Sequence, residues 1–469
     1  MREIVSELVY LAAAIIFIVG LKRMSSPATA RGGNLLSSVG MAMAIIVTAF
    51  DRGILDFQLI VAGMIIGSTL GLWLARAVKM TAMPQMVGIL NGFGGGASLL
   101  VGAAEWHRLI QPGAVMPADT AVTIWASALI GGVTFMGSMV AAMKLQEWVP
   151  GKPVQFRGQH ALNLVLVLAA MALAAFLTAR PDHGGVYLAL NAIALVLGVT
   201  LVIPIGGADM PVVICLLNSY SGLAAAMTGF VIRNDGLIIT GALVGASGLI
   251  LTSIMCKAMN RSLANVLFGG FGATVAVAGE REQALAARGV RTITAEDCAA
   301  LLCYSRRVMV VPGYGLAVAQ AQYQVHELAT MLEKRGVAVR FAIHPVAGRM
   351  PGHMNVLLAE ANVPYPSLLD HEAANPEFER TDVALVIGAN DVVNPAARSN
   401  PQSPIYGMPI LDVDKAGQVV VLKRSMNPGF AGIDNELFYD AKTAMLFGDA
   451  KQSLTALIQE VRAVEMAVT

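Results

Sequence analysis

The sequence is poor in charged residues and in cysteine, and each shortage excludes a class of protein. Only 13% of the 469 residues are Asp, Glu, Lys or Arg, against about 25% in water-soluble domains, which excludes an ordinary soluble protein. Cys215, Cys256, Cys298 and Cys303 have neither CxxC spacing nor a His-rich neighbourhood, so we expect free thiols and no metal site. A net charge of +1 gives no general attraction to nucleic acid, and we expect no such partner.

The few charges are unevenly spread along the chain. Residues 1–256 hold 23 of the 63 charged residues and residues 257–469 hold 40, or about 9% and about 19% of the two segments. The first segment contains nine low-charge runs long enough to cross a bilayer as helices: about 4–21, 34–50, 54–75, 84–104, 120–143, 161–179, 185–204, 210–232 and 236–256. We expect a polytopic α-helical membrane domain over 1–258, a Gly/Ala-rich linker over 259–290 and a soluble domain over 291–469.

Lys and Arg in the connections predict the orientation, because cytoplasmic connections are enriched in them. With the N-terminus outside, the cytoplasmic side holds Lys22, Arg23, Arg31, Arg76, Lys79, Lys144, Lys152, Arg157, Lys257 and Arg261. The other side holds only Arg2, Arg52, Arg108, Arg180 and Arg233. Nine spans then place the soluble domain in the cytoplasm.

Polar side chains within the apolar runs are costly and by default mark a pathway or a packing contact. Asn91 lies in the fourth run, Asp209 at the head of the eighth, and Asn218 within the eighth in the polar segment 218–221. A hydrogen bond between helices explains any single Asn or Ser equally well, and an N-cap before Pro211 explains Asp209. No histidine lies inside a run, so the usual titrating side chain of a proton path is missing.

Strands and helices alternate after residue 290. Apolar runs predict strands over 308–311, 337–343, 383–387, 409–413 and 419–422, and helical periodicity covers 317–334 and 451–464. This alternation is typical of an α/β doubly wound, Rossmann-like domain.

The joint between the first strand and its helix reads Gly313-Tyr314-Gly315-Leu316-Ala317-Val318, a GxGxxV turn. In a dinucleotide site the first glycine permits the turn, the second lets the backbone approach a pyrophosphate, and the helix N-terminus offers N–H groups. Gly-rich turns are common, and Val318 replaces the usual third Gly or Ala. The position between a strand and a helix strengthens the prediction of a dinucleotide site.

Basic residues at two strand ends favour NADP(H) over NAD(H). An NAD site has an acid after the second strand, whereas segment 343–353 offers His344, Arg349 and His353. Lys423, Arg424 and Ser425 follow the 419–422 strand and suit a ribose 2′-phosphate. Alternatively, Lys423 and Arg424 form a solvated loop and the two histidines are ordinary satisfied surface residues.

Asp391 ends the 383–387 strand in the sequence Gly388-Ala389-Asn390-Asp391. A carboxylate beside an anionic cofactor titrates in a useful range. An Asx turn or a cap is the structural alternative.

At these residues the chain resembles the beta subunit of the proton-translocating NAD(P) transhydrogenase. The resemblance covers essentially the whole length and is most specific at GGADMP (206–211), NSYSG (218–222), 312–322, 344–355, GAND (388–391), KRSM (423–426) and GDAK (448–451). It implies a Re/Si-specific enzyme in which this chain binds NADP(H) and a separate alpha subunit binds NAD(H). Hydride passes directly between the two nicotinamides, and inward proton movement drives NADPH formation.

The resemblance also implies which residues form the sites. Cofactor contacts are Gly313, Tyr314, Gly315 and Val318; Val346, Ala347, Gly348, Arg349, Met350 and Pro351; Gly388, Ala389, Asn390, Asp391 and Val392; Gly407 and Met408; Lys423, Arg424 and Ser425; and Asp449 and Ala450. Met426, Asn427, Pro428, Gly429 and Phe430 would fold over the cofactor as a lid. Asp391 would be the coupling carboxylate, and Asp209, Asn218 and Ser247 match proton-path positions.

Asn91 departs from part of the family, because some members have a proton-path histidine in the fourth span. We therefore expect the titrating group on a helix of the alpha subunit, without which this chain neither moves protons nor transfers hydride. The implied assembly is a dimer of alpha-beta units in the bilayer of the bacterial inner membrane.

Two other functions fit the composition. A channel or transporter gated by a nucleotide-sensing domain would use NADP(H) as a regulator, but it predicts a selectivity signature that the sequence lacks. A membrane-tethered NADPH-binding module without activity would leave the Asn and Asp residues in the spans unexplained.

Overall fold

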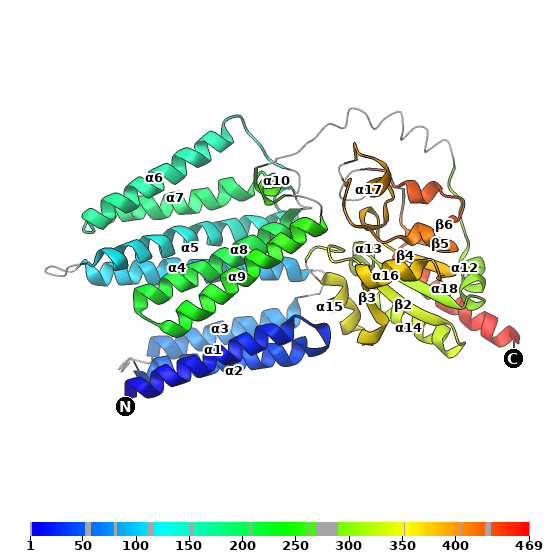
Figure 1. Ribbon diagram of the computed structural model, residues 1–469, viewed down its shortest axis with the longest axis horizontal. Coiled ribbons are helices and arrows are strands. Elements are labelled where there is room, and N and C mark those ends of the chain that lie inside the picture. The colour runs from blue at the N-terminus through cyan, green and yellow to red at the C-terminus, as the bar shows by residue number, and fades with distance from the viewer. Residues whose placement is uncertain are drawn as a thin grey trace. The chain divides into compact units, whose positions relative to one another are not determined.

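A computed structural model describes residues 2–51, 58–78, 82–110, 116–150, 153–206, 209–259, 262–268, 289–350, 352–403, 405–426 and 433–468. The chain divides into two compact units, Met1–Ser253 with Ala264–Gly270, and Ile254–Leu263 with Phe271–Thr469 (Figure 1). Within the predicted linker, Leu263–Phe268 form the short helix α10, while 260–261 and 269–288 lie outside the described residues.

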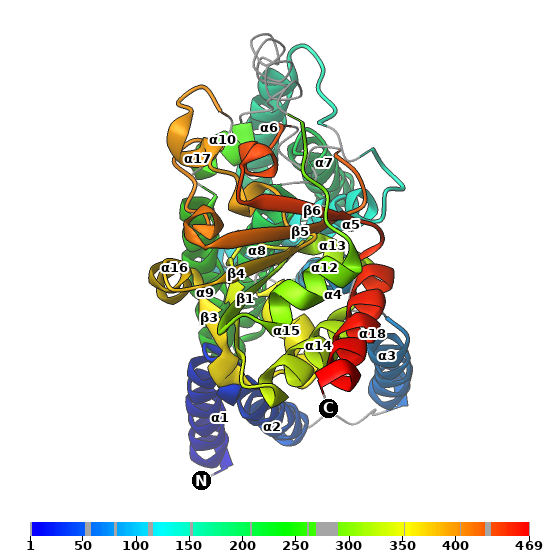
Figure 2. The same ribbon diagram turned by 90° about the vertical axis from the view of Figure 1, so that its right-hand side faces the viewer.

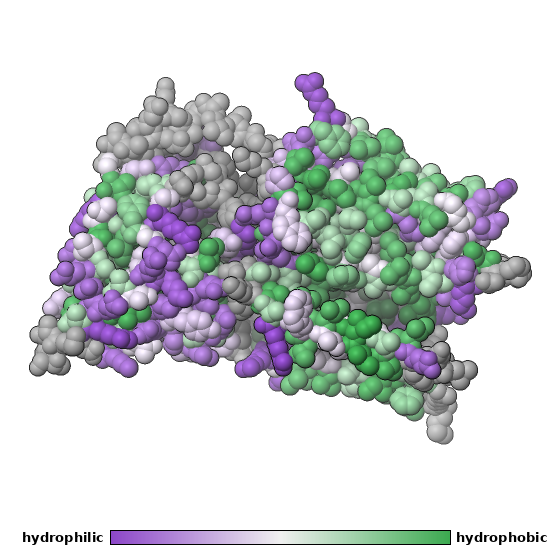
Figure 3. Space-filling model, turned by 180° about the vertical axis from the view of Figure 1, so that it is seen from behind, coloured by the Kyte–Doolittle hydropathy of each residue, from purple (hydrophilic) through white to green (hydrophobic). Residues whose placement is uncertain are grey.

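The first unit is a helical bundle, which confirms the nine predicted spans. Among the described residues, nine helices are long and apolar enough to cross a membrane. They are α1 (Arg2–Met24), α2 (Pro27–Asp51), α3 (Gln58–Ala77), α4 (Met83–Leu109), α5 (Ala118–Leu145), α6 (Gln159–Ala179), α7 (Gly184–Val202), α8 (Met210–Ile232) and α9 (Asp235–Ala258). Hydrophobic residues cover most of the visible surface of this unit, whereas the other unit is largely hydrophilic (Figure 3).

Small residues let the central helices α4, α5 and α7 approach closely. A Cβ built on Gly95 would lie 2.7 Å from the Gly131 carbonyl oxygen, and one on Gly198 would lie 2.6 Å from the Val133 carbonyl oxygen. Close backbone contact replaces the hydrophobic driving force that is missing between helices in lipid. Helices α5 and α8 are the most buried of the nine, so they form the centre of the bundle.

The second unit contains a six-stranded parallel sheet of order β3-β2-β1-β4-β5-β6. Its strands are β1 (Arg307–Pro312), β2 (Ala338–Ile343), β3 (Leu368–Asp370), β4 (Val383–Ile387), β5 (Gln418–Lys423) and β6 (Thr443–Phe447). This is the doubly wound order with its switch point between β1 and β4. The Rossmann-like prediction is confirmed.

Helices cover both faces of this sheet (Figure 2). Helices α12 (Ala295–Cys303), α14 (Gln322–Lys334) and α18 (Ala450–Val468) pack together on one face. On the other, alternate strand residues such as Val311 and Val386 share a buried core with Phe378 of α16 (His371–Phe378). Every side chain of β4 is buried, which explains why its sequence is an uninterrupted apolar run.

Two predicted elements of this unit are wrong. Segment 409–413 is not a strand: Leu411 donates its N–H to the Val392 carbonyl at 2.9 Å, and Val413 begins a 3-10 helix, η5 (Val413–Lys415). The side chains of Ile410, Leu411 and Val413 are buried, which explains why this segment is apolar although it does not belong to the sheet. The predicted 317–334 helix is two helices, α13 (Tyr314–Val318) and α14, because Gln320 between them has a φ of 51°.

Candidate functional site

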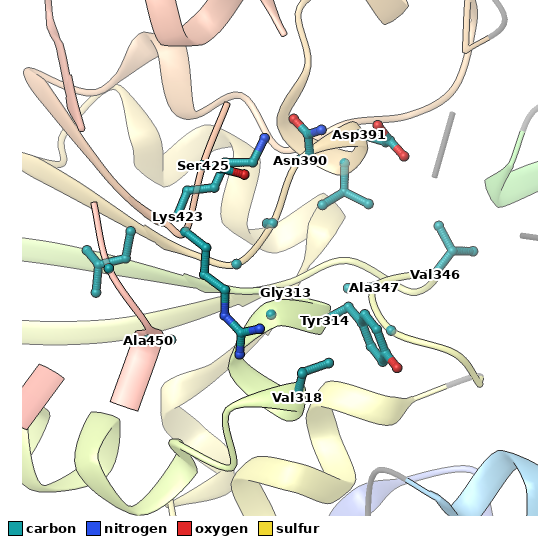
Figure 4. Close-up of a pocket in the computed structure, with 18 residues that line it drawn as sticks. Gly313, Tyr314, Val318, Val346, Ala347, Asn390, Asp391, Lys423, Ser425 and Ala450 are labelled. Atoms are coloured by element: carbon teal, nitrogen blue, oxygen red, sulfur yellow. The ribbon is translucent and has the colours of Figure 1, made fainter. Parts of the chain in front are cut away.

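A cavity of about 500 Å³ opens at the carboxyl ends of β1, β4 and β5 (Figure 4). In open α/β sheets, ligands bind at this place, where the strand order reverses. Its walls are formed by the turns after these strands and after β2 and β6: Gly313, Tyr314, Gly315, Val318, Val346, Ala347, Gly348, Gly388, Ala389, Asn390, Asp391, Val392, Leu422, Lys423, Arg424, Ser425, Gly448 and Ala450.

The floor of the cavity is made of two interlocked glycine turns. Pro312 of β1 pairs with Ile387 of β4, so the turns that follow lie side by side. A Cβ on Gly313 would lie 2.4 Å from the Ala389 Cα, and one on Gly388 would lie 2.4 Å from the Gly315 Cα. Gly388 also has a φ of 64°, which L side chains rarely adopt. These glycines are therefore required by turn-to-turn packing.

The N–H groups of the glycine turn are already used within the protein. Gly313 donates to the Ile387 carbonyl at 2.9 Å, and Gly315 donates to the Gly388 carbonyl at 2.9 Å. The N–H of Leu316 donates to the Gly313 carbonyl at 3.1 Å, and α13 is only five residues long. These three N–H groups therefore do not face a pyrophosphate as expected, because those of Gly313 and Gly315 bind the facing segment and that of Leu316 closes its own turn.

Two cations from the end of β5 line the cavity in different environments. Lys423 is half-buried, and its Nζ lies 4.7 Å from the centroid of the Phe438 ring. Burial lowers the pKa of Lys423, and the carboxylates of Asp434 and Asp391 oppose that shift. Arg424 donates to Asp449 Oδ2 at 2.8 Å with its side chain 62% exposed, so it is an exposed cation that an ion pair holds at the rim of the cavity.

Asp449 contacts this rim cation. Burial opposes ionisation of Asp449, but hydrogen bonds from Arg424 and from the Lys451 and Gln452 N–H groups outweigh it and lower its pKa. The Asp449 carboxylate therefore stays ionised beside Arg424.

Asp391 begins the 3-10 helix η4 (Asp391–Val393) directly after the β4 turn and lines the cavity (Figure 4). The preceding Asn390 accepts two hydrogen bonds from the Asn435 Nδ2, at 3.0 Å on its carbonyl oxygen and at 3.2 Å on Oδ1. Asn435 has no exposed surface. The position of the turn that carries Asp391 is thus fixed by a buried side chain from outside the cavity wall.

The loop after β2 contributes the third wall. Val346, Ala347 and Gly348 line the cavity, and the Arg349 Cζ lies 4.6 Å from the centroid of the Tyr314 ring. This cation–π contact joins the β2 loop to the glycine turn.

The two histidines of this loop are not surface residues, as one alternative had them. His344 and His353 are each 1% exposed. The His344 Nε2 lies 2.8 Å from the Pro409 carbonyl oxygen, and the His353 Nδ1 accepts the Arg349 N–H at 3.0 Å. Both rings brace the loop, and neither is among the cavity-lining residues. The expectation that they supply positive charge to a phosphate is wrong.

Burial makes the stability of this unit depend on pH. Desolvation lowers the pKa of His344 and of His353 from 6.5 to about 4. At His344 the hydrogen bond with the Pro409 carbonyl opposes this shift and the charge of His371 increases it. At His353 the charge of Arg349 increases the shift. Between pH 6.5 and about 4 the unfolded chain binds more protons, so the free energy of unfolding decreases as pH falls, by up to about 3 kcal/mol for each histidine. Calorimetric melting from pH 7 to pH 4.5 measures this loss, and His353→Asn should reduce the pH slope. A melting midpoint that does not change over this range would contradict the prediction.

Several expected contact residues are not among those that line the cavity in this structure. Arg349, Met350, Gly407, Met408, Met426 and Asp449 are described but do not line it. The Met408 side chain packs instead in a small apolar cluster with Ala397, Ile405 and Ile410. Pro351, Asn427, Pro428, Gly429 and Phe430 lie outside the described residues.

Sequence reasoning missed two residues of the wall, Leu422 and Gly448. Gly448 follows β6, a strand that was not predicted. The available sequence signal was the Gly448-Asp449-Ala450 turn, and the structure gives Gly448 a φ of 153°. Among the described residues no cluster of three or more His, Cys, Asp or Glu side chains could hold a metal ion.

The polar residues of the bundle fall into two groups. Asn91 is buried and donates to the Ser138 Oγ at 2.9 Å, while the Ser221 hydroxyl donates to the Asn91 Oδ1 at 2.5 Å. This network joins α4, α5 and α8. Asn218 and Ser247, in contrast, are exposed on α8 and α9. Asp209 is buried at the N-cap of α8 but makes no side-chain capping bond, so the capping alternative is not supported.

Comparison with known proteins adds a match over nearly the whole chain. A family model described as "NAD(P) transhydrogenase beta subunit" matches residues 6–460. The NAD(P) transhydrogenase subunit beta of Rhodospirillum rubrum is 49% identical over 457 residues, which cover 96% of this chain and 97% of that protein. The same subunit from a named strain of Rhodospirillum rubrum has the same identity and coverage.

Proposed function

Because the chain belongs to the NAD(P) transhydrogenase beta subunit family, we propose that it binds NADP(H) in the cavity at the β1/β4 switch point and exchanges hydride with NAD(H) held by an alpha subunit. We further propose that inward proton movement through the bundle drives NADPH formation. The observation that carries the proposal is the cavity itself, which combines two interlocked glycine turns with the polar side chains of Lys423, Arg424, Ser425 and Asp391.

The proposed roles follow from where each residue lies. Lys423 and Arg424 supply charge for a 2′-phosphate and Ser425 supplies a hydroxyl, since they line one side of the cavity together. Hydride transfer between two nicotinamides needs no protein acid, base or nucleophile, so the chain contributes orientation and exclusion of water. Tyr314 and the β2 loop residues 346–348 would form the wall that does this.

Titration of the full-length chain with NADPH and with NADH, followed by cofactor fluorescence, tests the binding proposal. NADPH should bind at least about tenfold more tightly, since one additional charge-assisted contact is worth about 1.5–3 kcal/mol. Equal affinity for NADPH and NADH would contradict the proposal that Lys423 and Arg424 bind the 2′-phosphate.

Coupling requires that protonation in the bundle change the relative affinity for NADP⁺ and NADPH. We assign Asp391 as the coupling carboxylate, since it lies on the cavity wall beside Lys423. Asp209, Asn91, Asn218 and Ser247 are the proposed proton-path residues.

An incomplete path within this chain agrees with the need for an alpha subunit. An exposed Asn at membrane depth is unfavourable against lipid, and Asn218 is exposed on α8, as Ser247 is on α9. We infer that a helix of the alpha subunit covers them and brings the titrating group to the Asn91 network.

The proposed assembly is a dimer of alpha-beta units in the bacterial inner membrane, with the N-terminus outside and the α/β unit cytoplasmic. The proposed membrane domain is 1–258, and the NADP(H) domain is 291–469.

Replacing Asn91 with leucine should reduce proton-coupled turnover at least about tenfold, because it removes both buried hydrogen bonds that Asn91 makes, to Ser138 and from Ser221, at about 1–3 kcal/mol each. NADPH binding should be unchanged. Thr134→Val is the matched control, since the buried Thr134 hydroxyl donates to the Ile130 carbonyl of its own helix. Uncoupler-sensitive turnover in membrane vesicles measures both variants, and full turnover in Asn91→Leu would exclude Asn91 from the path.

A further inference from the structure

Asn435 lies outside the cavity wall, yet it is hydrogen-bonded to a wall residue. It has no exposed surface and caps the 3-10 helix η6 (Glu436–Tyr439) by accepting the Leu437 N–H on its Oδ1 at 3.0 Å. A side-chain amide has one accepting and one donating end. Because the oxygen is held by Leu437, the NH₂ end must face Asn390.

That constraint passes to the Asn390 side chain. The Asn435 Nδ2 donates to the Asn390 Oδ1 at 3.2 Å as well as to the Asn390 carbonyl oxygen at 3.0 Å. The Asn390 amide therefore has its oxygen turned toward Asn435, and its own NH₂ group is left for another acceptor. Within the part of the chain that the structure describes, the Asn390 Nδ2 is buried and has no hydrogen-bond partner.

A buried donor without a partner in the protein is costly, and at a cavity wall a ligand can satisfy it. Asn390 lies on that wall, next to Asp391 (Figure 4). A flipped amide would present an oxygen at the same place and would repel an acceptor. The orientation of one buried amide thus decides whether the wall offers a donor or an acceptor.

We propose that Asn435 is a positioning residue that fixes the Asn390 amide so that its NH₂ donates to a carbonyl, phosphate or hydroxyl oxygen of the bound cofactor. This inference rests on the proposed function, because it takes the cavity to be the NADP(H) site. Asn435 itself touches no cavity surface, so its effect on binding passes through Asn390.

Asn435→Asp is the sharpest test. The new carboxylate keeps the Leu437 N–H, but it offers Asn390 only acceptors, so the Asn390 NH₂ turns toward it and the oxygen turns toward the cofactor. Affinity for NADPH should fall about tenfold, the worth of one hydrogen bond to a buried donor. Asn435→Ser also retains the cap but lacks the amide NH₂ group that holds the Asn390 oxygen, and it should give a smaller loss in the same direction.

Asn394→Asp is the matched control. Asn394 is equally buried and joins the same segment, donating to the Asp434 carbonyl at 3.0 Å and accepting the Ala396 N–H at 3.1 Å, without a hydrogen bond to Asn390. It should change the melting temperature about as much as Asn435→Asp but leave NADPH affinity within about twofold of the original chain, since its contacts do not orient the Asn390 amide.

A double-mutant cycle separates positioning from stability. NADPH affinity is measured by fluorescence titration of the full-length chain with its partner subunit, for each Asn435 variant with and without Asn390→Ala. If Asn435 acts through the Asn390 amide, its substitution costs clearly less affinity once that amide is gone, because only its bond to the Asn390 backbone carbonyl remains to be lost. Independent losses in the two backgrounds, or equal losses in Asn394→Asp and Asn435→Asp, would overturn the inference. If Asn435→Asp does not fold, Asn435→Ser completes the cycle. Failure of the unmodified complex to bind NADPH would instead contradict the proposed function.

Discussion

Gly388→Ala is expected to abolish NADP(H) binding and to destabilise the α/β unit by about 2–5 kcal/mol. A left-handed backbone costs a non-glycine residue about 1–2 kcal/mol, and overpacking adds about 1–3 kcal/mol. The added methyl group would lie 2.4 Å from the Gly315 Cα and 2.7 Å from the Leu316 nitrogen. Both are backbone atoms of the facing turn, so no side chain can move aside and the two turns must separate.

Gly336→Ala is the matched control for this substitution. Gly336 also has a positive φ, 83°, but no atom lies within 4 Å of a Cβ placed there. It should cost only the backbone term of about 1–2 kcal/mol and leave cofactor affinity unchanged. Calorimetric melting and NADPH titration measure both variants. Equal destabilisation by the two substitutions would show that turn-to-turn packing contributes nothing beyond φ.

Arg424→Gln is expected to weaken NADPH binding about tenfold to a hundredfold, with little effect on NADH. A hydrogen bond to a charged group is worth about 1.5–3 kcal/mol, and Arg424 lines the cavity with its side chain 62% exposed. Stability should change little, because an exposed ion pair contributes about 0–1 kcal/mol. Combining it with Lys423→Gln should remove most of the preference for NADPH.

Arg462→Gln controls for loss of an exposed arginine. Arg462 of α18 is 58% exposed and donates to Glu327 as Arg424 does to Asp449, but it is not among the cavity-lining residues. Its substitution should leave the NADPH and NADH affinities unchanged. Losses of similar size for NADPH and NADH in Arg424→Gln would contradict contact with a 2′-phosphate.

The membrane half was predictable from the sequence because lipid imposes length and polarity on every span. Each of the nine predicted runs matches a helix, although α2 begins at Pro27 rather than near residue 34. The apolar run predicts the membrane-spanning part of a helix but not where the helix begins or ends, because residues at the membrane interface continue the helix beyond the run.

The α/β half was predictable where strands are buried on both faces. Strand β4 has the predicted bounds, whereas the 409–413 run misled because side-chain burial does not require strand pairing. Strands β3 and β6 were missed: Leu368–Asp370 is a three-residue edge strand, and Thr443–Phe447 is a short run after a lysine.

The residues of the cavity wall followed from the family resemblance, but their physical roles did not. No pattern in the sequence shows that Gly313 and Gly315 pack against the turn at Gly388, because that contact joins distant segments of the chain. Likewise, the burial of His344 and His353 depends on tertiary packing that local sequence does not encode. Asn435 is the extreme case, since its effect on the wall passes through a second buried amide.

Reduction of an NAD⁺ analogue by NADPH, in sealed vesicles that contain this chain and its alpha subunit, tests proton-coupled hydride exchange most directly. Turnover should be present and should increase when an uncoupler removes the proton gradient that the reaction itself builds. NADPH binding without any turnover, or turnover that is the same with and without the uncoupler, would contradict the proposed function.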